Sequence, residues 1–173
     1  SGNEDANTRV IVIKAAGPAF SAGHDLRETR RRDDEDDIAW QARIDALLQD
    51  CAAMMTSILH TPKPIIACVQ GIASAAGCQL VSACDLAIAS EDATFCTPGV
   101  NIGAFCTTPL VGIGRNLSRK HALEMALTGD QFDAATAERF GLINRSVPAS
   151  ELEQATQELA GKIASRSAES IAR

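Results

Sequence analysis

Short apolar runs alternate along the chain with segments whose apolar residues recur at helical spacing. The runs from Arg9 to Lys14, Ile65 to Val69 and Leu86 to Ala89 are short and apolar, and the first two are rich in β-branched residues, so they predict buried strands. From Trp40 to Leu59 the apolar positions lie three or four residues apart, which predicts one apolar helical face. Ala76 to Ala83 is predicted to be a second, buried helix.

The second half of the chain is mainly helical by the same criteria. Helices are predicted over 109–117 and 120–127, and a short one between the cap Asp133 and the terminator Gly141. Residues 142–147 are predicted to be extended. Ser150-Glu151-Leu152-Glu153 has the spacing of a capping box and predicts that a helix opens there. Strands that alternate with helices predict an α/β domain.

Composition narrows the class of protein. The chain has 173 residues, 46% of them hydrophobic and 22% charged, which predicts a packed globular core. The formal net charge of −6 argues against general binding of nucleic acid. No apolar run reaches the roughly 18 residues that span a bilayer, so no membrane span is expected.

The six cysteines lie in or beside apolar segments, and none forms a C-x-x-C pair. We therefore expect small apolar fillers in the cytoplasm or another reducing compartment, without a metal site and without disulfides. A dense charge run, RETRRRDDEDD at 27–37, is predicted to be a solvated mobile loop.

Two segments of small residues each follow a predicted strand and lead towards a helix. They are FSAGHDL at 20–26 and ASAAGCQL at 73–80. Small residues let a ligand approach the backbone, and a helix start leaves N–H groups without internal partners. Two such groups aimed at one point would stabilise an oxyanion. Tight packing of a helix on a strand also requires small residues, so the pattern alone leaves both interpretations open.

These segments, followed by TPGVNIG and ALTGDQFDAATAERFGLINRSVP in the same order, resemble the crotonase family of enoyl-CoA hydratases and isomerases, in particular its divergent hydratase domain-containing members. The resemblance implies a spiral of β-β-α units with a helical C-terminal region that supports a homotrimer or a dimer of trimers. It divides the chain into an acyl-CoA-binding core at 1–128 and a helical region at 129–173. It also implies that both ends are shortened.

The resemblance further implies that an acyl-CoA thioester is bound, with coenzyme A as part of the substrate and no separate cofactor. By motif position the two backbone N–H donors to its oxyanion are His24 and Ala76. The remaining implied substrate-binding residues are Ala22, Asp25, Leu26, Arg27 and Gly77. Arg27 would contact a phosphate of coenzyme A, although a surface arginine in a charge run is an equal interpretation.

Hydratases of this family use two glutamates, and this chain has Gln79 and Gly99 at those positions. An amide orients water but cannot take its proton, which argues against efficient hydration or isomerisation by the usual mechanism. The other candidates for proton transfer are the acids Asp25, Asp85 and Glu124, the side chain of His24, and the stretch Phe105-Cys106-Thr107-Thr108.

Each of these candidates has a structural alternative, such as capping or loop packing, and His60 and His121 are expected to be structural. Ser74 lacks the G-x-S-x-G context of a serine hydrolase. Four outcomes stay open from the sequence. The chain is an enzyme of the hydratase/isomerase family with an unidentified proton-transfer group, or it catalyses another family reaction such as decarboxylation. Otherwise it is a non-catalytic acyl-CoA-binding or assembly module, or a structural paralogue without affinity for coenzyme A.

Overall fold

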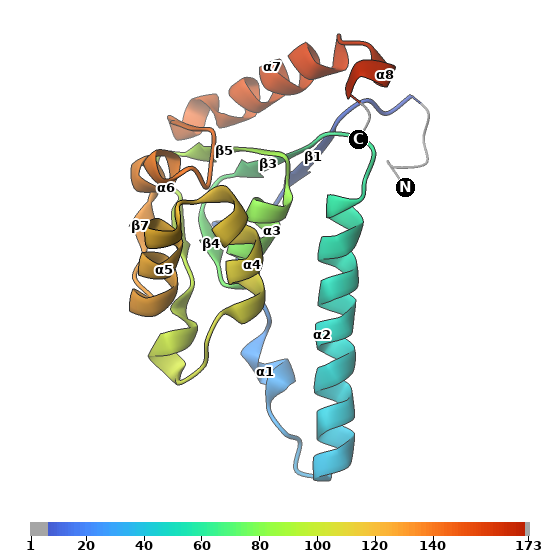
Figure 1. The fold of residues 1–173 in the computed structure, drawn as a ribbon, viewed down its shortest axis with the longest axis vertical. Coiled ribbons are helices and arrows are strands. Elements are labelled where there is room, and N and C mark those ends of the chain that lie inside the picture. The colour runs from blue at the N-terminus through green and yellow to red at the C-terminus, as the bar shows by residue number, and fades with distance from the viewer. Residues whose placement is uncertain (1–6, 172–173) are drawn as a thin grey trace.

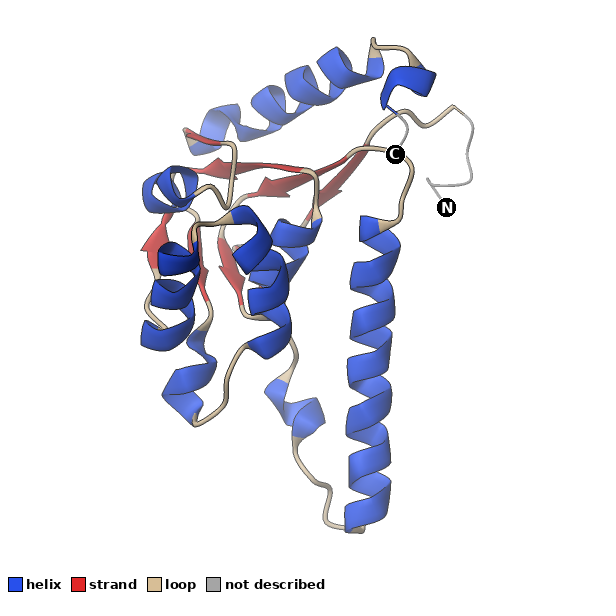
Figure 2. Cartoon of the chain, viewed as in Figure 1, coloured by secondary structure: helices blue, strands red, loops and turns tan. Residues whose placement is uncertain are grey.

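The computed structural model describes residues 7–171, whose strands form two four-stranded sheets (Figures 1 and 2). The first sheet is parallel throughout, in the order β1 (Ile11–Lys14), β3 (Ile65–Val69), β5 (Leu86–Ser90) and β8 (Arg145–Val147). The second has the order β2 (Ala19–Ser21), β4 (Ile72–Ser74), β6 (Thr94–Cys96) and β7 (Phe132–Asp133), and only its last pair is antiparallel.

Successive strands of the first half alternate between the two sheets. β1, β3 and β5 each enter the first sheet, and the strand that follows each of them enters the second. A helical segment then returns the chain to the first sheet. This is the expected spiral of β-β-α units, and it places the ends of β2 and β4 side by side at one edge of the molecule.

Helices join and cover the sheets, as Figure 2 shows in blue. Their bounds are α1 (Leu26–Thr29), α2 (Asp37–Leu59), α3 (Ala76–Ala83), α4 (Thr107–Asn116), α5 (Arg119–Thr128), α6 (Ala134–Phe140), α7 (Leu152–Ala164) and α8 (Ala168–Ile171), with 3-10 turns at Pro98–Ile102 and Ala149–Glu151. The predicted cap of α6 is confirmed, because the Asp133 side chain accepts from the Thr136 N–H and Gly141 ends the helix in the left-handed conformation.

The core lies on both faces of the first sheet. β3 is buried at every position, as its continuous apolar run predicts. One face, with Ala67 and Val69, belongs to the main cluster that includes α3. The opposite face, with Cys68 and Ile88, packs against Leu152 of α7, which runs along that side of the sheet in Figure 1.

Three local predictions are wrong. Ala19–Ser21, for which the sequence predicts no strand, is strand β2. The Ser150 capping box does not form, because Ser150 lies in a 3-10 turn and α7 begins at Leu152 without a side-chain cap. The charge run is not a plain solvated loop, because α1 occupies its start and Glu35 pairs with Arg43 of α2.

The predicted helix over 40–59 exists, but most of its apolar face is not buried. In α2 only Met55 and Ile58, near the C-terminal end, are buried, and Leu48 and Met54 are about half exposed at 49% and 47%. Figure 1 shows why: α2 stands beside the sheets, and its N-terminal half extends past them together with α1. No helix among residues 7–171 is both long and apolar enough to cross a membrane.

Candidate functional site

The loop after β2 meets the start of α3. Gly23 has a φ of +87°, and a Cβ atom placed on it would lie 3.2 Å from the Ala76 nitrogen and 3.1 Å from the Ser74 carbonyl oxygen. A glycine is needed here on both counts, because the conformation is left-handed and the approach is close. The two small-residue segments of the sequence therefore converge at the backbone of Gly23 and Ala76.

Two amide groups at this junction have no acceptor among the residues that the structure describes. Within residues 7–171, neither the His24 N–H nor the Ala76 N–H donates a hydrogen bond to another residue. The Ala76 amide is the first of α3, where the helix itself offers no acceptor and the helix dipole adds partial positive charge. Its neighbour Ala75, by contrast, donates to the Cys96 carbonyl at 2.9 Å.

Ala75 is strained. Its φ of 50° and ψ of −112° make it the one residue other than glycine with a positive φ in the described part of the chain. Such conformations cost on the order of 1–3 kcal/mol and persist where the surrounding structure imposes them. The bond from Ala75 to Cys96 holds this turn, and the turn sets the direction of the Ala76 amide.

One cavity of about 590 Å³ brings together five of the predicted site residues: Ala22, His24, Leu26, Ala76 and Gly99. The rest of its wall is mostly small or apolar and comes from α2, the β4–α3 turn and the 98–109 segment: Leu48, Ser74, Ala75, Pro98, Asn101, Ile102, Ala104, Phe105, Cys106, Thr107, Thr108 and Pro109. Among residues 7–171, the ionisable side chains on the wall of this cavity are those of His24 and Cys106, and no carboxylate lies on it.

Gln79 does not line that cavity. It lines a neighbouring one of about 340 Å³ with Ser82, Asp85 and Arg115, and Thr108 lies on the wall of both. The Gln79 Oε1 atom is buried and, within the described residues, accepts no hydrogen bond. Gln79 and Gly99 thus line two neighbouring cavities that share Thr108.

Gly99 faces the segment that follows it. A Cβ atom there would lie 3.0 Å from the Cys106 Sγ and 3.1 Å from the Cys106 nitrogen. These contacts are tighter than ordinary packing allows, so the space that a side chain at position 99 needs is occupied by Cys106. The glutamate that the resemblance expects at this position would have to displace it.

Asp25 and Arg27 contact each other and do not line the cavity. Arg27 Nη2 lies 2.7 Å from Asp25 Oδ2, and its Nε lies 3.0 Å from Oδ1. The hydrogen bonds from Arg27 lower the pKa of Asp25 to about 2, so its carboxylate is not suited to accept a proton near neutral pH. The Arg27 side chain is 87% exposed, and its contact with a coenzyme A phosphate stays a prediction.

The other titratable candidates are held elsewhere. Asp85 Oδ2 accepts from the Ile65 N–H at 2.7 Å, at the start of β3, and Glu124 is exposed on α5. Gly77, another predicted site residue, packs against Ser21 of β2 and does not line the cavity.

Burial raises the pKa of the Cys78 thiol, which donates to the Ala73 carbonyl at 2.9 Å. No group of His, Cys, Asp or Glu side chains among residues 7–171 is placed to hold a metal ion.

The apolar wall of the cavity is the part that sequence reasoning missed. Leu48 of α2 and Ile102 and Phe105 of the 98–109 segment are exposed apolar side chains on it. The sequence places Leu48 on the apolar helix face and Phe105 in a stretch with a chemical or a loop-packing role, but it assigns neither to a substrate wall. The available signal is the aromatic Phe105 in a stretch of otherwise small and polar residues.

The enoyl-CoA hydratase/isomerase family profile matches residues 2–173. The chain belongs to this family. Its sequence is 46% identical over 169 residues to the mitochondrial enoyl-CoA hydratase domain-containing protein 3 of Mus musculus, covering 98% of this chain and 54% of that protein. The resemblance to the divergent hydratase domain-containing members is thereby confirmed.

Solved structures of family members share the fold. The human enoyl coenzyme A hydratase domain-containing protein 3 aligns with a TM-score of 0.88 at 44% identity, over 98% of this chain and 64% of that one. An enoyl-CoA hydratase of Mycobacterium smegmatis aligns with a TM-score of 0.89 at 41% identity, again over 98% and 64%. The chain spans about half the length of the curated relatives it matches.

Proposed function

We propose that this chain binds an acyl-CoA thioester in the cavity lined by Ala22, Leu26 and Phe105, with the thioester oxygen between the His24 and Ala76 amides. The observation that carries the proposal is that His24 and Ala76 line one cavity and that, among residues 7–171, neither of their amides has a protein acceptor. A thioester oxygen gains negative charge when the α-carbon loses a proton or a carboxyl group. Two fixed donors stabilise that charge, and losing one typically raises the barrier by about 3 kcal/mol.

The acyl group would lie against the apolar wall. Leu48, Ile102 and Phe105 are exposed by 44% to 66%, so covering them with an alkyl chain removes apolar surface from water. Asp25 and Arg27 follow His24 in the chain, outside the cavity, and would contact the coenzyme A portion of the ligand. Arg27 would exchange part of its bond to Asp25 for a phosphate oxygen.

A non-catalytic acyl-CoA-binding module is the second candidate. The absence of any carboxylate from the cavity wall favours it, because general acid–base groups contribute about 100- to 10,000-fold each. His24 and Cys106 are the titratable groups left for a reaction that needs a proton transfer. Turnover of crotonyl-CoA, followed beside binding of the saturated butyryl-CoA, separates the two candidates.

The binding geometry is tested by comparing butyryl-CoA with S-butyl-CoA, a thioether without the carbonyl oxygen, by calorimetric titration. We expect the thioester to bind more tightly. Replacement of Ala76 by proline deletes one donor at the first position of α3 and should abolish the preference. Ala75 precedes it at φ 50° and ψ −112°, outside the region that a residue before proline favours, so circular dichroism first checks that the variant folds. Arg119→Pro at the first position of α5 is the matched control and should retain it. A folded Ala76→Pro variant that keeps the preference would contradict the proposal.

The homotrimer, or dimer of trimers, that the resemblance implies stays a prediction. Analytical ultracentrifugation of the chain, with and without butyryl-CoA, measures its assembly directly. A monomer that still binds the thioester would show that the cavity is complete within one chain.

A further inference from the structure

Helix α1 is too short to be stable alone. It has four residues, none of them buried, whereas isolated helices below about 12 residues are marginal in water. Its start is held by Asp25, whose side chain accepts from the Arg27 N–H at 2.9 Å and whose carbonyl accepts from the Glu28 N–H at 2.9 Å. It begins two residues after His24 and places Leu26 on the cavity wall. The position of α1 therefore affects both the direction of the chain at His24 and the shape of the cavity wall.

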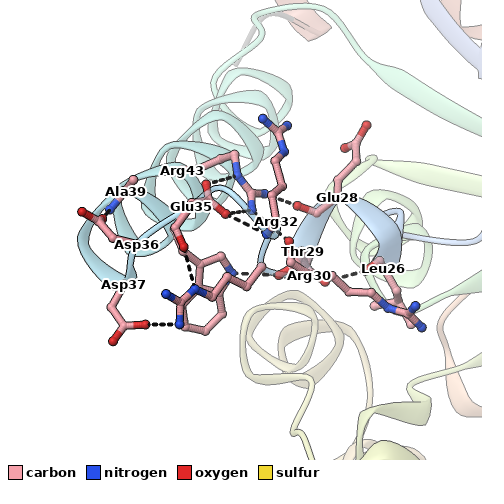
Figure 3. Close-up of polar contacts among 12 residues, drawn as sticks. Leu26, Glu28, Thr29, Arg30, Arg32, Glu35, Asp36, Asp37, Ala39 and Arg43 are labelled. Carbon is pink, nitrogen blue, oxygen red and sulfur yellow. Dashed lines mark hydrogen bonds and ion pairs between the residues drawn. The ribbon is translucent and has the colours of Figure 1, made fainter.

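The end of α1 is held by two side chains of α2. Three consecutive carbonyls, those of Glu28, Thr29 and Arg30, each accept a hydrogen bond from Arg43 or Trp40 (Figure 3). The Trp40 Nε1 donates to the Thr29 oxygen at 3.0 Å, and the Arg43 Nη2 donates to the Arg30 oxygen at 2.9 Å. The last carbonyls of a helix lack internal partners and carry partial negative charge, so a guanidinium is a strong cap.

Glu35 fixes the guanidinium that makes these contacts. Arg43 Nε lies 2.8 Å from Glu35 Oε1, and Arg43 Nη2 lies 2.7 Å from Oε2. The pair is bidentate, and its side chains are only 24% and 9% exposed, so it is less screened than a surface ion pair. Glu35 Oε2 also accepts from the Arg32 N–H at 3.2 Å, which closes the loop between α1 and α2.

The geometry points to a strap, formed by Glu35, Trp40 and Arg43, that positions His24 for the thioester. Arg43 and Trp40 are positioning residues: they hold α1, and α1 fixes the direction in which the chain leaves His24. Glu35 orients Arg43. The inference rests on the proposed function, since it assigns these residues to the same site. Displacement of a donor by about 1 Å is enough to weaken a preorganised contact.

The test compares Arg43→Lys and Trp40→Phe with Arg31→Lys. Lysine keeps the charge, but its three donors cannot reproduce the four hydrogen bonds that the planar guanidinium makes to Glu35 and the two carbonyls. Phenylalanine keeps an aromatic ring but not the indole N–H. Arg31 contacts Asp37 and the Glu35 carbonyl but not α1, so it is the matched control. Hydrogen exchange of the Arg27 and Glu28 amides reports on α1, and affinities for butyryl-CoA and S-butyl-CoA report on the site.

We expect exchange of those two amides to accelerate about tenfold in Arg43→Lys and Trp40→Phe, because charge-assisted or buried hydrogen bonds are lost. The affinity for butyryl-CoA should fall more than that for the thioether, and Arg31→Lys should match the unmodified chain. A purely structural role would lower both affinities alike. Unchanged exchange, or faster exchange with an unchanged thioester preference, would overturn the inference.

The unmodified chain distinguishes this result from failure of the proposed function. If it binds neither butyryl-CoA nor S-butyl-CoA, the proposed acyl-CoA site is refuted, and so is the positioning role of the strap. If it binds both and prefers the thioester, only the variants decide whether the strap positions His24.

Discussion

Gly77 at the start of α3 lies against Ser21 of β2, so closely that a Cβ atom on Gly77 would stand 2.2 Å from the Ser21 carbonyl oxygen. The nearest atoms are the backbone carbonyl group and the Cβ atom of Ser21, and a shift of backbone atoms in β2 would disturb the strand. This contact brings the N-terminus of α3 to the end of β2, two residues before Gly23. The close approach of Gly23 to Ala76 thus depends on the absence of a side chain at position 77.

Gly77→Ala should therefore destabilise the fold and disturb the site together. Overpacking a well-packed core typically costs about 1–3 kcal/mol, and we expect a loss at or above the upper end because the clash is with backbone. Urea unfolding measures it. Gly161→Ala in α7 is the control, since no atom lies within 4 Å of its Cβ position and alanine favours a helix by about 1 kcal/mol. Equal effects of the two substitutions would contradict this packing.

Gly99 and Cys106 should show energetic coupling. Gly99→Ala places a methyl group 3.0 Å from the Cys106 Sγ and should cost about 1–2 kcal/mol. In the Cys106→Ala background the same change should cost less, because the sulfur is gone. A double-mutant cycle by urea unfolding should give a coupling of at least about 0.5 kcal/mol. Additive effects would show that the 98–106 segment moves freely.

Ala75 and Ala76 should respond in opposite directions to glycine. Ala75→Gly relieves a positive φ, which should stabilise the fold by up to about 1 kcal/mol after the entropy of the unfolded glycine is counted. Ala76→Gly replaces a helical alanine and should destabilise by about 0.5–1 kcal/mol. Thermal unfolding of the two variants checks the sign. Destabilisation by Ala75→Gly would mean that its turn carries no strain.

Local sequence patterns predicted the elements that have a continuous apolar run or clear boundary residues. β3 is apolar at all five positions, and α6 carries its boundary signals in Asp133 and Gly141. The second sheet escaped prediction because its strands have two or three residues, too few to show alternation. Their pairing is decided by the neighbouring turns of the spiral.

The candidate site was predictable where it depends on small residues and not where it depends on long ones. The resemblance implied that His24 and Ala76 lie together, and the small residues of both segments leave room for Gly23 to approach Ala76. Which cavity Gln79 faces depends on how an eight-residue helix is rotated against its neighbours. Likewise, the pairing of Glu35 with Arg43 requires the charge run to fold back on α2, which no periodicity records.

The strap should weaken in acid. Hydrogen bonds from Arg43 lower the pKa of Glu35 from its usual 4.5 to about 2, so folding favours the charged carboxylate. Its contribution is fully present above pH 4.5 and is lost as the pH falls towards 2. We expect the difference in free energy of unfolding between the unmodified chain and Glu35→Gln to be constant near neutral pH and to shrink below pH 4.5. Asp25, whose pKa Arg27 also lowers to about 2, titrates in both proteins and cancels. A difference that does not change with pH would show that Glu35 is not paired in solution.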